Sequence, residues 1–184
     1  VYLDTRPVNW LSMPAENEIG NDELYMLLHI PEGGSETLSF TMRARSCTLS
    51  LGSMQGGVFV ENYAQSIPVH QAYSHTIRAD SLPAGNTTAD GFRQCLCRLK
   101  ADTIKEFFPE APLRGVVDFA GHAASATRLT RCSNSSQHAF PQLRYFALYG
   151  QSNLSYAFGM FGKFANLQAV RALDLSAVET AKHM

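Results

Sequence analysis

The sequence has few charged residues and no cluster of charge of one sign. Only 17% of its 184 residues are charged, below the roughly 25% that is typical of soluble domains. The net charge is −1, and no run of lysines and arginines occurs. Because binding to nucleic acid depends on clustered basic residues, we expect no nucleic-acid partner. A surface built from serine, threonine, asparagine and glutamine is better suited to glycans or other proteins.

A long hydrophobic run is also missing. The longest uncharged stretch, residues 145–162, is interrupted by glutamine, asparagine, serine and glycine. A membrane-spanning helix needs about 20 mainly apolar residues, so we expect no membrane insertion. The chain starts at Val1, and its first segment lacks the layout of a signal peptide. At this length we expect residues 1–184 to form a single domain, excised from a larger precursor.

Recognisable catalytic and cofactor motifs are absent. The sequence has no G-x-S-x-G elbow, no P-loop and no Rossmann fingerprint. Cys95 and Cys97 have C-x-C spacing, whereas structural zinc sites use a C-x₂₋₄-C turn that brings two sulfurs to one metal. We therefore predict a protein that is not an enzyme, with no catalytic residues, no metal and no cofactor.

One alternative is a small secreted cysteine hydrolase. Its nucleophile would be Cys132, and His122 or His138 would accept the thiol proton. The simpler interpretation is that both histidines are loop residues. Alkylation of the free thiols would separate the two interpretations.

The four cysteines, Cys47, Cys95, Cys97 and Cys132, are compatible with disulfides but do not require them. Free cysteine is among the most buried residue types, so the simplest prediction is four small apolar side chains in strands. On one strand, Cys95 and Cys97 would project to the same face, and a bridge between them would be strained. The disulfide connectivity is not determined by the sequence.

What the sequence does contain is alternation of apolar and polar residues over residues 36–52. The apolar row consists of Leu38, Phe40, Met42 and Ala44, followed by Cys47, Leu49 and Leu51. Polar residues such as Thr41, Arg43 and Ser50 lie between them. Because side chains of a strand point to opposite faces with a period of two, this pattern predicts a strand pair with one face on a core and the other in water.

Further strand signals follow at short intervals, separated by turns rich in glycine and proline. They lie at residues 24–30, 57–64, 70–79, 92–101, 115–121, 143–150 and 154–162. Residues 103–115 allow a short helix, and the tail at 164–184 fits helix and strand equally. We predict a mainly β fold, an antiparallel β-barrel or sandwich with long polar loops and little helix.

Binding in such a scaffold is expected in its loops. The longest polar loop, residues 80–91, has almost nothing to bury. A long loop without buried side chains usually has a functional reason to exist. We predict binding residues at Asn86, Thr87, Thr88 and Asp90.

This layout resembles the protruding spike domain of an avian astrovirus capsid protein. The resemblance is carried by the strands of residues 36–52, the polar loops 80–91 and 133–142, and the aromatic segments 143–150 and 154–161. It implies a domain on the virion surface that attaches to a host-cell receptor, either glycan or protein. It also implies that the domain displays antigenic surface to neutralising antibodies.

The resemblance further implies a homodimer. Tyr149, Tyr156 and Phe161 are candidate interface residues, and the other interpretation is that these rings fill the core. Sedimentation would test the dimer. A cellular lectin-like module, secreted rather than viral, is the remaining alternative, and the flanking precursor sequence would distinguish it from a spike.

Overall fold

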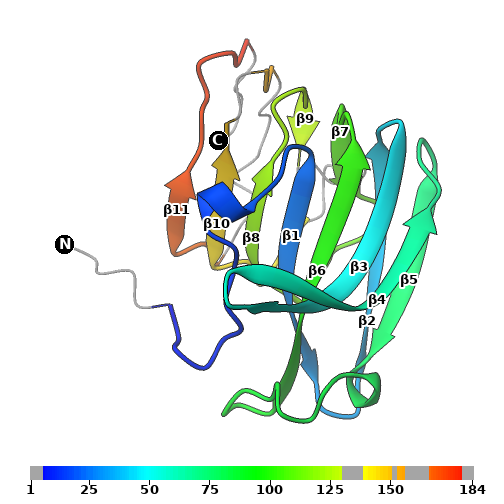
Figure 1. Ribbon diagram of the computed structural model, residues 1–184, viewed down its shortest axis with the longest axis vertical. Helices are drawn as coiled ribbons and strands as arrows, with labels where there is room; N and C mark the ends of the chain where they lie inside the picture. Colours follow the sequence, from blue (N-terminus) through cyan, green and yellow to red (C-terminus); the bar gives the residue numbers. More distant parts are fainter. Residues whose placement is uncertain (1–5, 130–138, 151–152, 156–165, 180–184) are drawn as a thin grey trace.

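The computed structural model describes residues 6–129, 139–150, 153–155 and 166–179 (Figure 1). The regular elements in this part of the chain are strands and two short 3₁₀ turns, Glu16–Glu18 and Ala79–Ser81. The strands are β1 (Glu23–Pro31), β2 (Ser35–Arg43), β3 (Ser46–Gln55), β4 (Val58–Ile67), β5 (Ala72–Arg78), β6 (Phe92–Asp102), β7 (Glu106–Pro109), β8 (Val116–His122), β9 (Arg128–Leu129), β10 (Tyr145–Tyr149) and β11 (Ala169–Ala172). The prediction of a mainly β fold with little helix is confirmed.

The strands form two sheets that pack as a sandwich. The large sheet has the order β11-β10-β8-β1-β6-β3-β4, and the small sheet has the order β5-β2-β7-β9. The sheets do not close into a barrel, so the sandwich is the correct one of the two predicted architectures. Most pairs are antiparallel, but β10 runs parallel to β8 and β11, and β7 runs parallel to β9. Both sheets are therefore mixed, which corrects the expectation of purely antiparallel pairing.

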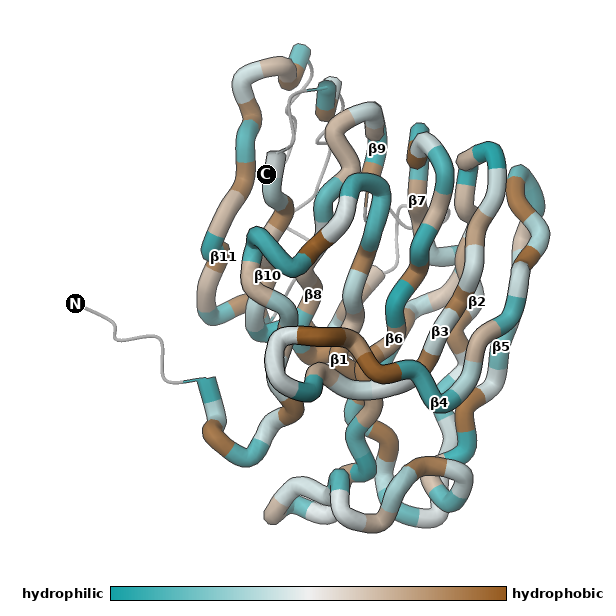
Figure 2. Tube along the Cα trace, in the orientation of Figure 1, coloured by the Kyte–Doolittle hydropathy of each residue, from teal (hydrophilic) through white to brown (hydrophobic). Residues whose placement is uncertain are grey.

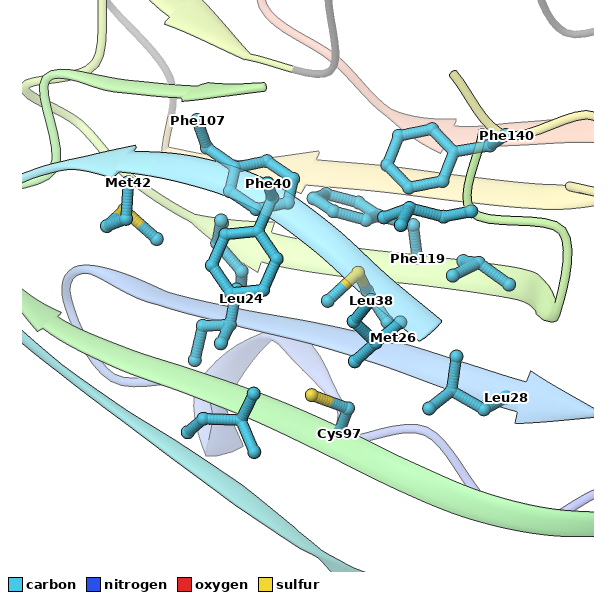
Figure 3. Packing of buried hydrophobic residues seen from close by; sticks show 14 of the residues in the cluster. Leu24, Met26, Leu28, Leu38, Phe40, Met42, Cys97, Phe107, Phe119 and Phe140 are labelled. Atoms are coloured by element: carbon cyan, nitrogen blue, oxygen red, sulfur yellow. The ribbon is translucent and has the colours of Figure 1, made fainter. Parts of the chain in front are cut away.

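Apolar side chains from both sheets fill the space between them (Figure 3). Met26 and Leu28 of β1 point into this core, as do Leu38 and Phe40 of β2, and all four are fully buried. The Phe40 ring lies 5.4 Å from the ring of Phe107 in β7. Burial of each such side chain contributes about 1.5–3 kcal/mol, which makes this cluster the main source of stability.

The opposite face of the large sheet is also covered. A second buried cluster lies there, which includes Tyr25, Leu27 and Leu96. The partly buried side chains that pack on it are Trp10, Leu11 and Met13 of the N-terminal segment, Met54 and Phe59 of the β3–β4 hairpin, and Tyr149. Figure 1 and Figure 2 show the hairpin crossing in front of the sheet. Because both faces of β1 are covered, its sequence is an apolar run rather than an alternating pattern.

The alternating residues 36–52 form two strands that belong to different sheets. β2 pairs with β5 and β7 in the small sheet, whereas β3 pairs with β4 and β6 in the large one. The apolar row changes phase between Ala44 and Cys47, where the chain crosses from one sheet to the other. The whole predicted apolar row is buried. Not every residue of the polar row is exposed to solvent, because Ser50 on the outer side of β3 is fully buried.

Three other expectations have definite outcomes. The stretch at residues 103–115 contains strand β7 rather than a short helix, and the C-terminal tail contains strand β11. Most of the segment predicted at residues 154–162 lies outside the described residues. Within the described ranges, no helix is long and apolar enough to cross a membrane.

Candidate functional site

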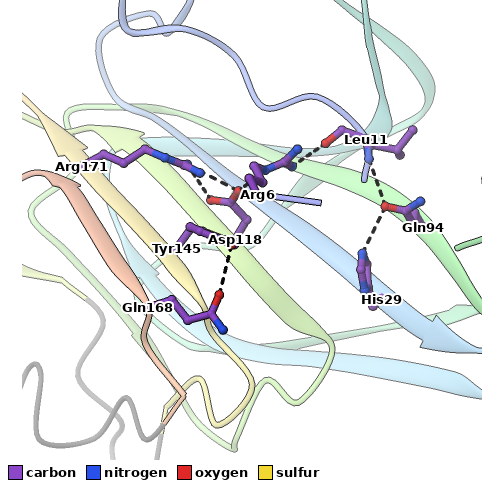
Figure 4. A network of polar contacts seen from close by, with 8 residues as sticks. All are labelled: Arg6, Leu11, His29, Gln94, Asp118, Tyr145, Gln168 and Arg171. Atoms are coloured by element: carbon purple, nitrogen blue, oxygen red, sulfur yellow. Dashed lines mark hydrogen bonds and ion pairs between the residues drawn. The ribbon is translucent and has the colours of Figure 1, made fainter. Parts of the chain in front are cut away.

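The candidate site is built on a buried carboxylate (Figure 4). Asp118 lies on β8, and its side chain is fully buried. Arg6 Nε donates to Asp118 Oδ2 at 2.8 Å, and Arg171 Nη1 lies 3.4 Å from Oδ1. Burial raises the pKa of Asp118 above its ordinary value, although both guanidinium groups pull it down. One carboxylate thus ties the N-terminal segment and β11 to the middle of the large sheet.

A second set of polar contacts centres on the buried amide of Gln94 in β6 (Figure 4). Its Oε1 accepts from the backbone N–H of Leu11 at 3.0 Å and lies 3.1 Å from His29 Nε2. Its Nε2 donates to the backbone oxygen of Asn9 at 2.9 Å. Because the amide oxygen can only accept, His29 carries its proton on Nε2. Burial lowers the pKa of His29 to about 4, so the ring is neutral at pH 7.

Trp10, the single tryptophan of the chain, lies between these two sets of contacts. Its ring meets the rings of His29 and Tyr145 edge-on, at centroid distances of 4.7 Å and 5.7 Å. The guanidinium carbons of Arg6 and Arg144 lie 5.5 Å and 5.6 Å from the tryptophan ring centroid. Cations at this distance are attracted to the ring face. Trp10 therefore holds two arginines next to the sheet.

Trp10, His29 and Arg144 line one side of a pocket of about 370 Å³, which we call the Trp10 pocket. Its walls come from segments far apart in the sequence: Pro7, Asn9, Trp10, His29, Thr88, Asp90, Phe92, Arg114, Val117, Gln142 and Arg144. The buried members, among them His29 and Val117, form the floor, whereas Arg114, Arg144 and Asp90 are exposed at the rim. The pocket thus combines an aromatic and apolar interior with charged groups at its entrance.

The four residues predicted to bind a partner do not lie in one place. Thr88 and Asp90 line the Trp10 pocket, whereas Asn86 lines a different cavity and Thr87 lines neither. Thr88 is buried, and its Oγ1 accepts a hydrogen bond from the backbone N–H of Phe92 at 3.1 Å. The loop 80–91 therefore has a buried side chain, contrary to expectation, and Thr88 holds the loop in shape.

The cavity next to Asn86 has a volume of about 480 Å³ and is lined by residues of β4 and β5, which are edge strands of the two sheets. Tyr63 of β4 and His75 of β5 meet there, with ring centroids 5.2 Å apart. Burial lowers the pKa of His75. Cys95 also lines this cavity.

Cys47, Cys95 and Cys97 are free thiols in the core between the sheets, as the simplest interpretation predicts. Burial raises the pKa of Cys47 and Cys95 to about 12, and that of Cys97 well above its ordinary value. Thiols of this kind stay protonated at neutral pH and are poor nucleophiles. The fourth cysteine, Cys132, lies outside the described residues.

The hydrolase alternative stays a prediction. His122, at the end of β8, is half-buried, and its Nδ1 has no hydrogen-bond partner among the described residues. Its Nε2 packs closely against Gly150, because a Cβ added at residue 150 would lie 2.2 Å from this nitrogen. Both residues that could complete a catalytic pair, Cys132 and His138, lie outside the described residues. In the part of the chain that the structure describes, no group of three or more potential metal ligands lies together.

Sequence patterns alone indicate little of the Trp10 pocket. Asp118 is the single acid within the apolar residues 116–121. It was a usable signal, because a charge inside a buried strand needs a partner. Arg114 and Arg144 flank segments with little charge, but nothing in the sequence brings them to the same place. Comparisons with protein-family models, with curated proteins and with solved structures find no match to this chain.

Proposed function

We propose that this chain is an attachment domain, the surface spike of a viral capsid, and that it contacts a host-cell receptor through the Trp10 pocket and the adjoining loop 80–91. The observation that supports the proposal is that polar and charged residues from separate segments meet at this pocket. Thr88 and Asp90 of the predicted binding loop line it together with arginines from two other segments, Arg114 and Arg144. Ligand sites usually combine an apolar interior with a few polar groups in this way.

The scaffold is consistent with such a role. Loops and a terminal segment line the pocket together with residues of β1, β6 and β8, strands of the large sheet that is buried on both faces. Rigid sheets that carry variable binding loops are a common solution for recognition. Exposed loop residues such as Thr87 and Asp90 would also be accessible to antibodies.

A homodimer is part of the proposal. Of its candidate interface residues, Tyr149 is half-buried against the outer cluster of the large sheet. Tyr156 and Phe161 lie outside the described residues. Sedimentation equilibrium over a range of concentrations measures the association directly, and a species that stays monomeric at high concentration contradicts it.

The attachment role is tested with the fluorescently labelled domain added to cultured avian cells. We expect saturable binding that the unlabelled domain competes away and that protects the cells from the virus encoding it. The double variant Thr87→Ala, Asp90→Ala should bind more weakly, because both residues are exposed on the loop.

The matched control is Thr37→Ala, Asp102→Ala, which removes the same groups from exposed positions away from the pocket. This variant should bind as the unchanged domain does. Absence of saturable binding to any cell tested, with the domain folded, contradicts the proposal. If cells of many species bind without any effect on infection, a cellular lectin-like module is the better description.

A further inference from the structure

The rim of the Trp10 pocket carries two guanidinium groups without a carboxylate bound to them. Arg114 and Arg144 are exposed, and neither forms an ion pair with any described residue. The Arg144 guanidinium lies over the face of Trp10. Burial raises the pKa of Glu36, and the positive charge of Arg114 partly opposes this shift, although the two side chains form no ion pair. All eight other arginines that the structure describes form ion pairs with acids.

The positive charge at the pocket is larger than the rim alone provides. Arg6 lies on the same tryptophan ring as Arg144, although its Nε is engaged by Asp118. Asp90 is the one acid among the lining residues that the structure describes. An anionic group entering the pocket would therefore meet two guanidinium groups with donors to spare, and guanidinium binds carboxylate or sulfate through paired hydrogen bonds.

The remaining polar groups suit a ligand with hydroxyl groups. Asn9, Gln142 and Asp90 lie at the same pocket, and between them they offer amide donors and carboxylate acceptors. Phe92 and His29 provide a stacked aromatic surface, with centroids 5.9 Å apart. A sugar ring has the matching combination of hydroxyl edges and an apolar face.

The volume limits the size of the ligand. At about 370 Å³ the pocket is near the lower end of the range of about 300–1,000 Å³ for ligand sites. It can take one sugar unit, and longer chains would extend out of it. A protein segment would instead need a groove or a larger flat contact area.

We propose that the Trp10 pocket binds an acidic sugar, with the anionic group of the sugar held by Arg114 and Arg144 and its hydroxyl groups held by Asn9, Gln142 and Asp90. This inference rests on the proposed attachment function and deepens it, because it names the receptor group that is recognised. An acidic peptide is the competing ligand.

The test is a binding measurement by titration calorimetry or ligand-observed NMR on the whole domain. The probes are sialyllactose, which carries a carboxylate, a sulfated heparin disaccharide, neutral lactose and a glutamate-rich peptide. We expect binding of at least one acidic sugar, no binding of lactose, and weaker binding as the salt concentration rises. The comparison of the two acidic sugars identifies which anion the pocket takes.

Arg114→Gln and Arg144→Gln should each weaken binding of that sugar about tenfold or more, because each removes a charge-assisted hydrogen bond. Arg45→Gln is the matched control. Its guanidinium is exposed and pairs with Asp102, at the end of β6 opposite the pocket. Binding by Arg45→Gln should equal that of the unchanged domain. Circular dichroism checks that all three variants are folded.

Equal binding of lactose and sialyllactose, binding of the peptide alone, or binding of no probe overturns the inference. So does acidic-sugar binding that survives both pocket substitutions. The cell-binding assay separates this failure from failure of the attachment function. If both pocket variants still bind cells, the acidic-sugar site is wrong and the attachment role stands. If the unchanged domain binds acidic sugar but no cell, the attachment role is wrong.

Discussion

At the scale of single residues, Asp118 is the buried charge that joins the N-terminal segment and β11 to the large sheet. A carboxylate with no exposed surface costs free energy unless opposite charges and donors compensate for it. Arg6 and Arg171 supply that compensation from segments about fifty or more positions away in the sequence. The sequence of β8 indicated that Asp118 needs a partner of opposite charge. The same sequence does not show which arginine is that partner.

The first prediction concerns loss of that partner. Arg6→Met removes the 2.8 Å contact to Asp118 and leaves the carboxylate with only the longer contact to Arg171. We expect a loss of about 2 kcal/mol in the free energy of unfolding at pH 7. Urea denaturation measures it, and Arg45→Met serves as the exposed control.

The pH dependence of this variant checks the cause. Without Arg6, the pKa of Asp118, already raised by burial, rises further. Its charge then destabilises the folded state at neutral pH, and protonation removes that penalty. The difference between variant and wild type should therefore shrink as the pH falls to about 4, near the pKa of an unfolded aspartate. A difference that stays constant with pH contradicts the assignment.

The second prediction concerns His29. Its pKa is about 4 in the folded state and 6.5 in the unfolded reference, so the unfolded state takes up the proton first. Stability should fall as the pH drops from 6.5 to 4, by up to about 3 kcal/mol from this residue. His29→Gln retains a donor to Gln94 but does not titrate, so it should lose this slope. Denaturation at several pH values compares the two proteins.

The third prediction concerns the core thiols. Cys47, Cys95 and Cys97 are buried with raised pKa values, so iodoacetamide should leave them unmodified in the native protein and label them after denaturation. Peptide mapping by mass spectrometry locates the label. Rapid native labelling at any of the three contradicts their burial.

At the scale of elements, the β3–β4 hairpin contains a bulge that interrupts its regular pairing. The pairing register shifts between Leu51 and Gly52, so Asn62 of β4 is the extra residue of a bulge. Bulges bend a strand and increase its twist. This bend directs Met54 and Phe59 onto the outer face of the large sheet. The guanidinium carbon of Arg98 lies 4.5 Å from the Phe59 ring centroid and adds to the contact.

The fourth prediction tests the bend. A Cβ at Gly52 would lie 2.0 Å from the backbone oxygen of Val60, and only a backbone shift could relieve that clash. Gly52→Ala should therefore destabilise the domain by about 2 kcal/mol, which lowers the Tm by about 4–8 °C in a protein of this size. Gly85→Ala, where a Cβ would meet no atom within 4 Å, is the control and should leave the Tm nearly unchanged.

Local sequence patterns predicted most strands but not which strands pair with one another. Alternation identified the buried rows of β2 and β3, and alternation of Tyr73, His75 and Ile77 identified the inner face of β5. Sheet membership was not predictable, because a strand shows the same period of two in either sheet. The parallel insertion of β10 beside β8 depends on contacts between distant segments, which the sequence pattern does not encode.

At the scale of the whole molecule, the domain has three layers rather than two. The small sheet, the large sheet, and a cover made by the N-terminal segment and the β3–β4 hairpin lie one on another. Apolar periodicity predicted strands that bury one face, and it left a barrel and a sandwich both open. The N-terminal part of this layer lies on the sheet without being one of its strands, so its residues show no strand periodicity. Beyond Gly52, the end of the hairpin pairs within itself and no longer with β6. The candidate site lies along the edge of this third layer, which explains why only its loop residues Thr88 and Asp90 were found.

The way in which the N-terminal segment is held on the large sheet makes ligand binding observable by hydrogen exchange. The backbone N–H of Leu11 donates to a side chain, Gln94 Oε1, and not to a neighbouring strand. Its exchange with deuterated solvent therefore requires only that residues 9–11 lift off the sheet, whereas the amides of β1 exchange only when the sheet opens. A ligand that bridges Asn9 and Arg144 would hold that segment down. Slower deuterium uptake at Leu11, with β1 unchanged, would thus report occupancy of the Trp10 pocket from a backbone position outside it.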